Sequence, residues 1–147
     1  MTEAKRLIEG LVRQRDKYAE VATISERQRG FLESGDLDGL MMLIESKRTC
    51  LEEIEAIKRD TAGLLERWPE VRAQAAPEIV RSVEKVVEET RALLERILKI
   101  EEEDRAKFEQ GRDKRAAEIR GLQQRKKMRD AYGQKGKGDS GLIDDKK

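Results

Sequence analysis

PEIVRSVEKVVEETRALLERILKIEEED, residues 77–104, carries the pattern that decides the fold. Mostly apolar positions recur in alternating steps of four and three residues: Ile79, Val83, Val86, Thr90, Leu93, Ile97, Ile100 and Asp104. This alternation places one narrow stripe along a helix and is typical of coiled-coil packing. The early cluster of valines also suits a strand, but the spacing and the length of the run favour a helix. Pro77 at the first helical position and Glu78 in the first turn suit a helix start.

Two further amphipathic helices are predicted before this stretch, at about residues 2–34 and 37–68. The first carries its apolar side chains at Leu7, Leu11, Tyr18, Val21, Ile24 and Leu32. The second carries them at Leu37, Leu40, Ile44, Leu51, Ile54, Ile57, Leu64 and Trp68. Between them, Gly35 suits a left-handed helix cap, and Asp36 suits the position that accepts a bond from the next helix's free amides. Pro69 bars normal continuation of the second helix, and residues 73–76 are expected to form a loop.

The composition narrows the class of protein. Charged residues make up 43% of the chain and aromatic residues 3%, and there are two prolines, which favours long helices sharing narrow apolar interfaces. No apolar run approaches the ~18 residues of a membrane span, and the N-terminus lacks the apolar core of a signal peptide. We therefore expect a cytoplasmic, all-α protein that is not membrane-embedded. Its fold should be an elongated antiparallel bundle or coiled coil of three long helices, the third longest, with a disordered tail at residues 133–147.

Catalytic chemistry is not expected from these residues. The chain contains no histidine, which removes the side chain best suited to acid–base work at neutral pH and a common metal ligand. The carboxylates of residues 101–104 are adjacent on a helix, so they point in different directions and cannot converge on one ion. Cys50 is interpreted as a small interface residue, and the C-terminal glycines lack the context of a phosphate loop. We predict no enzyme activity, no cofactor and no metal.

The region after residue 110 differs from the rest. We expect the second helix to cover the third only from Pro77 to about Phe108, after which apolar positions thin. Residues 1–110 would therefore form the bundle and residues 111–132 a projecting helix. Residues 112–137 hold ten Lys/Arg against three Asp/Glu, a net charge of +7, whereas the residues before them net −5. Its large apolar side chains are the predicted partner-binding residues: Ile119, Leu122, Met128 and Tyr132. The alternative interpretation is a frayed, solvated helix end.

Three local features resemble the FlgN family of flagellar export chaperones. They are LESGDLDGL at residues 32–40, Lys47 followed by Leu51 and Ile54, and AYGQKG at residues 131–136. The resemblance implies a cytoplasmic chaperone that holds terminal helical segments of hook-associated (hook–filament junction) proteins before type III export. It further implies that the C-terminal helix grips the substrate and that Tyr132 docks on the membrane-embedded export gate.

Other interpretations remain open. The chain could be a sister chaperone for the flagellar filament cap or the coiled-coil stalk of the export ATPase. It could also be a structural coiled coil that homodimerises through the third helix. The basic residues 125–129 suit nucleic-acid phosphates, but no aromatic residues are interleaved among them for base stacking, so specific nucleic-acid binding is not expected.

Overall fold

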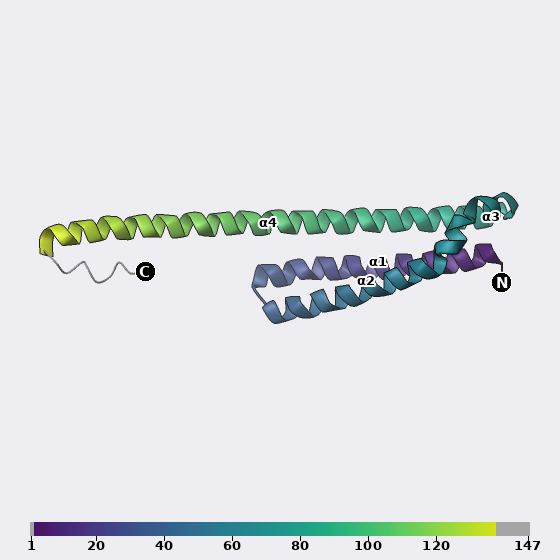
Figure 1. Cartoon of the computed structure of the whole chain (residues 1–147), viewed down its shortest axis with the longest axis horizontal. Helices are drawn as coiled ribbons and strands as arrows, with labels where there is room; N and C mark the ends of the chain where they lie inside the picture. The colour runs from purple at the N-terminus through teal and green to yellow at the C-terminus, as the bar shows by residue number, and fades with distance from the viewer. Residues whose placement is uncertain (1, 138–147) are drawn as a thin grey trace. The chain divides into compact units, whose positions relative to one another are not determined.

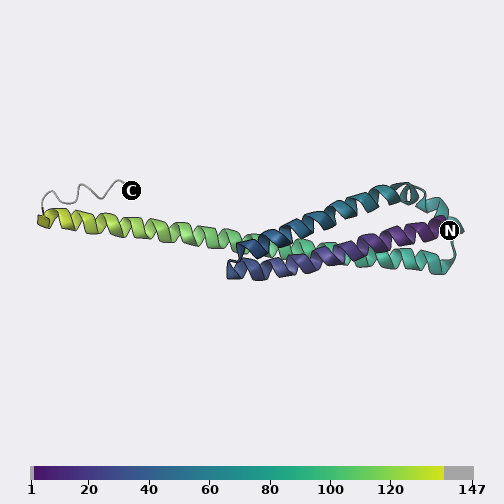
Figure 2. The same cartoon turned by 90° about the horizontal axis from the view of Figure 1, so that it is seen from below.

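The computed structural model describes residues 2–137, and all regular secondary structure within them is helical. Four helices follow one another: α1 (Glu3–Ser34), α2 (Leu37–Glu66), α3 (Trp68–Gln74) and α4 (Pro77–Lys137). Figures 1 and 2 show their course. The chain divides into two compact units, residues 1–104 and the residues from Arg105 on. The predicted all-α class with a longest final helix is therefore confirmed for the described residues.

In the first unit, α2 runs antiparallel to α1, and α4 runs parallel to α1. Between α1 and α2, Gln14 contacts Thr61 and Lys17 contacts Glu53, so positions further along α1 meet earlier positions of α2. Between α1 and α4, Arg15 pairs with Glu89 and Arg29 with Asp104, so positions further along α1 meet later positions of α4. Short connections between successive helices dictate this arrangement, because each helix must turn back on the one before it.

The core of this unit consists of two apolar clusters. One joins Tyr18, Val21 and Ala22 of α1 to Cys50 and Ile54 of α2 and Ile97 of α4. The other joins Leu7 and Leu11 of α1 to Val83 and Val86 of α4, with Leu64 and Trp68 packed against it. Burying each large side chain contributes about 1.5–3 kcal/mol. The buried residues of α4 all belong to the alternating stripe read from residues 77–104, so that register is confirmed.

The register predicted for α2 is partly wrong. Leu37, Ile44 and Leu51 are exposed. The buried residues of α2 are Leu43, Cys50, Ile54, Ile57 and Thr61. These positions also follow one another in steps of four and three residues once Lys47 is included. The Lys47 side chain is mostly buried and pairs with Glu101 of α4. A stripe chosen by hydrophobicity alone passes over lysine, cysteine and threonine, so it shifted to the neighbouring leucines and isoleucines.

Small residues let α1 and α2 approach closely. A Cβ atom built on Gly10 would lie 2.0 Å from Cγ2 of Thr61, so only glycine fits there without movement. Ala22 and Ser25 are likewise buried on α1, whereas Leu32, predicted as part of its apolar face, is exposed. Sequence periodicity favours large apolar residues and does not reveal which small residues a close helix contact requires.

The first junction follows the prediction. Gly35 has φ 74°, in the left-handed region, and its amide donates to the carbonyl of Phe31. The Asp36 carboxylate accepts a hydrogen bond from the amide of Gly39 at 3.0 Å and so caps α2. A Cβ atom on Gly39 would lie 2.5 Å from a ring carbon of Phe31, so this glycine admits the aromatic ring against the turn.

The second junction differs from the prediction. Instead of one helix ending at about residue 68 and a loop at residues 73–76, α2 ends at Glu66 and the short helix α3 follows. Pro69 lies in the first turn of α3, where its missing amide costs no helical hydrogen bond. A proline that ends one helix thus begins the next, and the loop shortens to Ala75 and Ala76.

In the second unit, α4 continues past residue 110 without interruption. The helix reaches Lys137, beyond the end expected at Tyr132, so regular structure extends into the stretch predicted as tail. The rest of the predicted disordered tail, residues 138–147, lies outside the described residues.

Candidate functional site

The four residues predicted to bind a partner all lie on α4 in the second unit and are exposed. Their exposed fractions are 55% for Ile119, 59% for Leu122, 60% for Met128 and 70% for Tyr132. Large apolar side chains left in water at this level are candidates for contact with another protein. The structure therefore places every predicted residue on the surface of a helix.

Helix geometry divides these residues between two faces. At about 100° per residue, Ile119 and Leu122 lie roughly 60° apart, and Met128 and Tyr132 lie roughly 40° apart. The centres of the two pairs are separated by about 130° around the helix axis. The prediction had grouped Met128 with Ile119 and Leu122, but the continuous helix places it beside Tyr132.

Phe108 is a residue that sequence reasoning missed. It precedes Ile119 by eleven residues, which is close to three helical turns, so it lies only about 20° from Ile119 around α4. Its side chain is 57% exposed. The spacing of Phe108 from Ile119 carries this signal, but Phe108 coincides with the predicted end of the part of the third helix that the second helix covers.

Cations lie between the apolar residues on this face. Phe108, Arg112, Arg115, Ile119, Leu122 and Lys126 follow one another in steps of four and three, and we call them the Phe108–Lys126 row. Apolar side chains on such a row can pack against an amphipathic helix, while the cations suit carboxylates at its edges. We call the second group the Met128–Tyr132 face. Neither group contains a carboxylate, histidine, cysteine or serine side chain that could form a catalytic pair with Lys126 or Tyr132, so the row is suited to binding.

The side chains considered for chemistry in the first unit have structural roles. Cys50 is buried, and burial raises the pKa of its thiol, so the reactive thiolate is disfavoured. Of the carboxylates at residues 101–104, Glu101 pairs with Lys47, and Glu103 and Asp104 pair with Arg29. No group of three potential metal ligands converges among residues 2–137.

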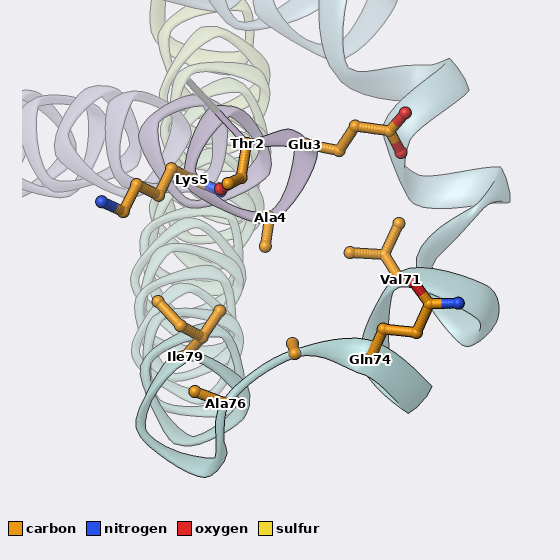
Figure 3. A pocket seen from close by; sticks show the side chains of 9 residues that line it. Thr2, Glu3, Ala4, Lys5, Val71, Gln74, Ala76 and Ile79 are labelled. Carbon is orange, nitrogen blue, oxygen red and sulfur yellow. The ribbon is translucent and has the colours of Figure 1, made fainter.

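A pocket lies in the first unit, between the start of α1, the short helix α3 and the start of α4. Figure 3 shows Ala4, Val71 and Ile79 around it, with Lys5 pointing away. Glu3, at its rim, pairs with Arg67. Its lining mixes short apolar side chains with Thr2 and Gln74. It contains no histidine, no cysteine and no second carboxylate beside Glu3, so no reaction is assigned to it.

Comparison with known families identifies the class of protein. The sequence profile described as FlgN protein matches residues 1–139. The chain belongs to the FlgN family. FlgN proteins are flagellar chaperones for hook-associated proteins and are not enzymes. No curated protein and no solved structure matches this FlgN-family chain. None of the helices in the described part is long and apolar enough to cross a membrane.

Proposed function

We propose that this FlgN-family chaperone works in the cytoplasm, holds terminal helical segments of hook-associated proteins on the Phe108–Lys126 row, and delivers them to the type III export gate. The observation that carries the proposal is the exposure of Phe108, Ile119 and Leu122 on one face of α4. A chaperone that holds an amphipathic helical segment needs such a face, because the apolar stripe of the segment is buried against it on binding.

The expected binding energy suits reversible binding of the substrate. Burying three such side chains contributes about 1.5–3 kcal/mol each, and this gain is offset by the entropy lost when the substrate segment becomes ordered and bound. The cations Arg112, Arg115 and Lys126 would attract an acidic substrate segment and accelerate its encounter with the row. Affinity of this kind falls with added salt and permits release at the export machinery.

Delivery is assigned to the Met128–Tyr132 face. Because this face is turned by about 130° from the Phe108–Lys126 row, an aromatic ring there remains available while a substrate occupies the row. Tyr132 has the highest exposure of the apolar residues on this part of α4. Its large ring with a polar tip suits a contact at an interface.

The test is calorimetric titration of a hook-associated protein, and separately of the soluble domain of the export gate, into full-length variants. Ile119→Ala combined with Leu122→Ala should weaken substrate binding at least tenfold, equivalent to ~1.4 kcal/mol, and leave gate binding unchanged. Tyr132→Ala should do the reverse. Met128→Ala serves as the matched apolar truncation, since it lies off the row and should spare substrate binding.

A truncation ending at Gln110 should lose both partners. If it binds both as well as the full chain does, the residues after 110 are only a helix end and the proposal is wrong. Titrating a filament-cap protein in parallel identifies the substrate class: tighter binding of the cap protein would assign the chain to a different flagellar cargo.

A further inference from the structure

A second exposed apolar surface lies in the first unit, where α1 turns into α2. The most exposed large apolar side chains there are Leu37 at 71%, Met41 at 65% and Met42 at 72%. Leu32 and Ile44 are exposed beside them in the sequence. Leu37, Met41 and Ile44 are spaced by four and three residues, so they form a row along α2 that faces neither core cluster. We call residues 31–46 the hairpin tip.

The backbone of the hairpin tip is held in place by specific contacts. Gly35 adopts the left-handed conformation that ends α1, and Asp36 caps α2 through the amide of Gly39. The close approach of the Phe31 ring to Gly39 fixes the turn from inside. Leu37, Met41 and Ile44 therefore lie on a defined helical surface, although they contribute little to the core.

The charge of the hairpin tip has one sign. Residues 31–46 contain four carboxylates, from Glu33, Asp36, Asp38 and Glu45, and no lysine or arginine. The cations that flank them in sequence are already engaged: Arg29 pairs with Glu103 and Asp104, and Lys47 pairs with Glu101. Arg48 neutralises only Glu45 among the four. An apolar row with an acidic border remains.

We propose that the hairpin tip is a docking surface for a basic amphipathic helix of another protein, separate from the Phe108–Lys126 row. The spacing of Leu37, Met41 and Ile44 matches the apolar stripe of a partner helix, and lysines or arginines beside that stripe would meet Glu33 and Asp38. Methionine side chains adapt to differently shaped partners, which suits a surface that recognises a pattern of charge and apolarity. This site goes beyond the proposed grip on export substrates, whose row is basic and selects the opposite charge.

Two synthetic helical peptides test this by titration into the full chain. Both carry leucine at the heptad a and d positions, and one has lysine and the other glutamate elsewhere. The Leu–Lys peptide should bind the hairpin tip, with affinity that falls as salt is added. Leu37→Ala combined with Met41→Ala should raise its dissociation constant at least about tenfold. Glu33→Lys with Asp38→Lys should abolish its binding.

Matched control variants distinguish binding at the hairpin tip from nonspecific hydrophobic or electrostatic binding of the peptide elsewhere on the chain. Leu65→Ala with Leu98→Ala removes two exposed leucines outside the tip, and Glu70→Lys with Glu95→Lys makes the same change in net charge elsewhere. Both should leave binding of the Leu–Lys peptide unchanged. Ile119→Ala with Leu122→Ala should also spare it while weakening the Leu–Glu peptide, so the two proposals fail independently. Equal loss in tip and control variants would overturn the inference, as would a dimer of the chain that the Leu37→Ala, Met41→Ala variant dissociates.

Discussion

Gly10 and Thr61 mark a close approach of α1 to α2. Glycine brings the two backbones together, and the Thr61 methyl fills the space that a side chain at residue 10 would occupy. The Thr61 hydroxyl donates to the carbonyl of Ile57 at 2.9 Å and accepts from the Gln14 amide at 3.2 Å. Its hydrogen-bonding capacity is thus satisfied inside the interface, so it does not carry the cost of an unpaired buried polar group.

Gly10→Ala should destabilise the protein, because the new methyl group overlaps Cγ2 of Thr61. Overpacking of this kind lowers the free energy of unfolding by about 1–3 kcal/mol, which urea denaturation measures. Adding Thr61→Ser should restore most of the loss, since serine keeps the hydroxyl and removes the overlapping methyl. Gly63→Ala, where nothing lies within 4 Å of the new atom, is the control and should be neutral or stabilising. A stabilising Gly10→Ala would mean that α1 and α2 do not approach as described.

Within the first unit, α4 shows how one residue step separates core from surface. Ile97 is 6% exposed and belongs to the cluster around Ile54, whereas the adjacent Leu98 is 64% exposed. Successive residues on a helix point about 100° apart, so two similar side chains have different surroundings. The register of the stripe, rather than hydrophobicity, determines which of them stabilises the bundle.

Ile97→Ala should therefore lower the free energy of unfolding by about 2–4 kcal/mol, the usual cost of truncating a buried aliphatic side chain. Leu98→Ala should change it by no more than about 0.5 kcal/mol. Thermal or urea unfolding of the two variants measures the difference. Equal effects at both positions would show that α4 is rotated relative to the register described above.

For the whole molecule, stability and the proposed grip on the export substrate are assigned to different parts of the chain. Both core clusters lie in residues 1–104, as do the ion pairs that join Arg15 to Glu89, Lys17 to Glu53 and Arg29 to Asp104. The proposed substrate row lies in the second unit, where the apolar side chains that carry it are exposed. Changes to that row can consequently alter partner binding without removing a buried contact.

A truncation ending at Gln110 should unfold at the same urea concentration as the full chain, within about 0.5 kcal/mol in free energy of unfolding, because it keeps every core residue. Ile119→Ala combined with Leu122→Ala should also preserve that midpoint. The control is a truncation ending at Lys99, which removes Ile100 and the acids that pair with Arg29 and Lys47, and should lower the midpoint. A large loss in the first truncation would show that the second unit stabilises the first.

The sequence alone determined the features that depend on local chemistry. The stripe in residues 77–104 fixed the register of α4, and Gly35 with Asp36 fixed the first turn, because heptad spacing and helix caps act over a few residues. Ile119, Leu122 and Tyr132 could also be predicted as candidates, because they are large side chains in a basic helical stretch.

Only the tertiary structure decided which side chains face inward where residue type is ambiguous. It buried Cys50 and Thr61 on α2, placed the Lys47 side chain mostly out of water, and left Leu37 and Met41 exposed. The reason is that burial depends on the neighbouring helix: Glu101 supplies a charge for Lys47, and Gly10 leaves room for Thr61. The unbroken course of α4 likewise separated Met128 from Ile119, because the face that a residue occupies depends on helical structure being continuous between the two positions.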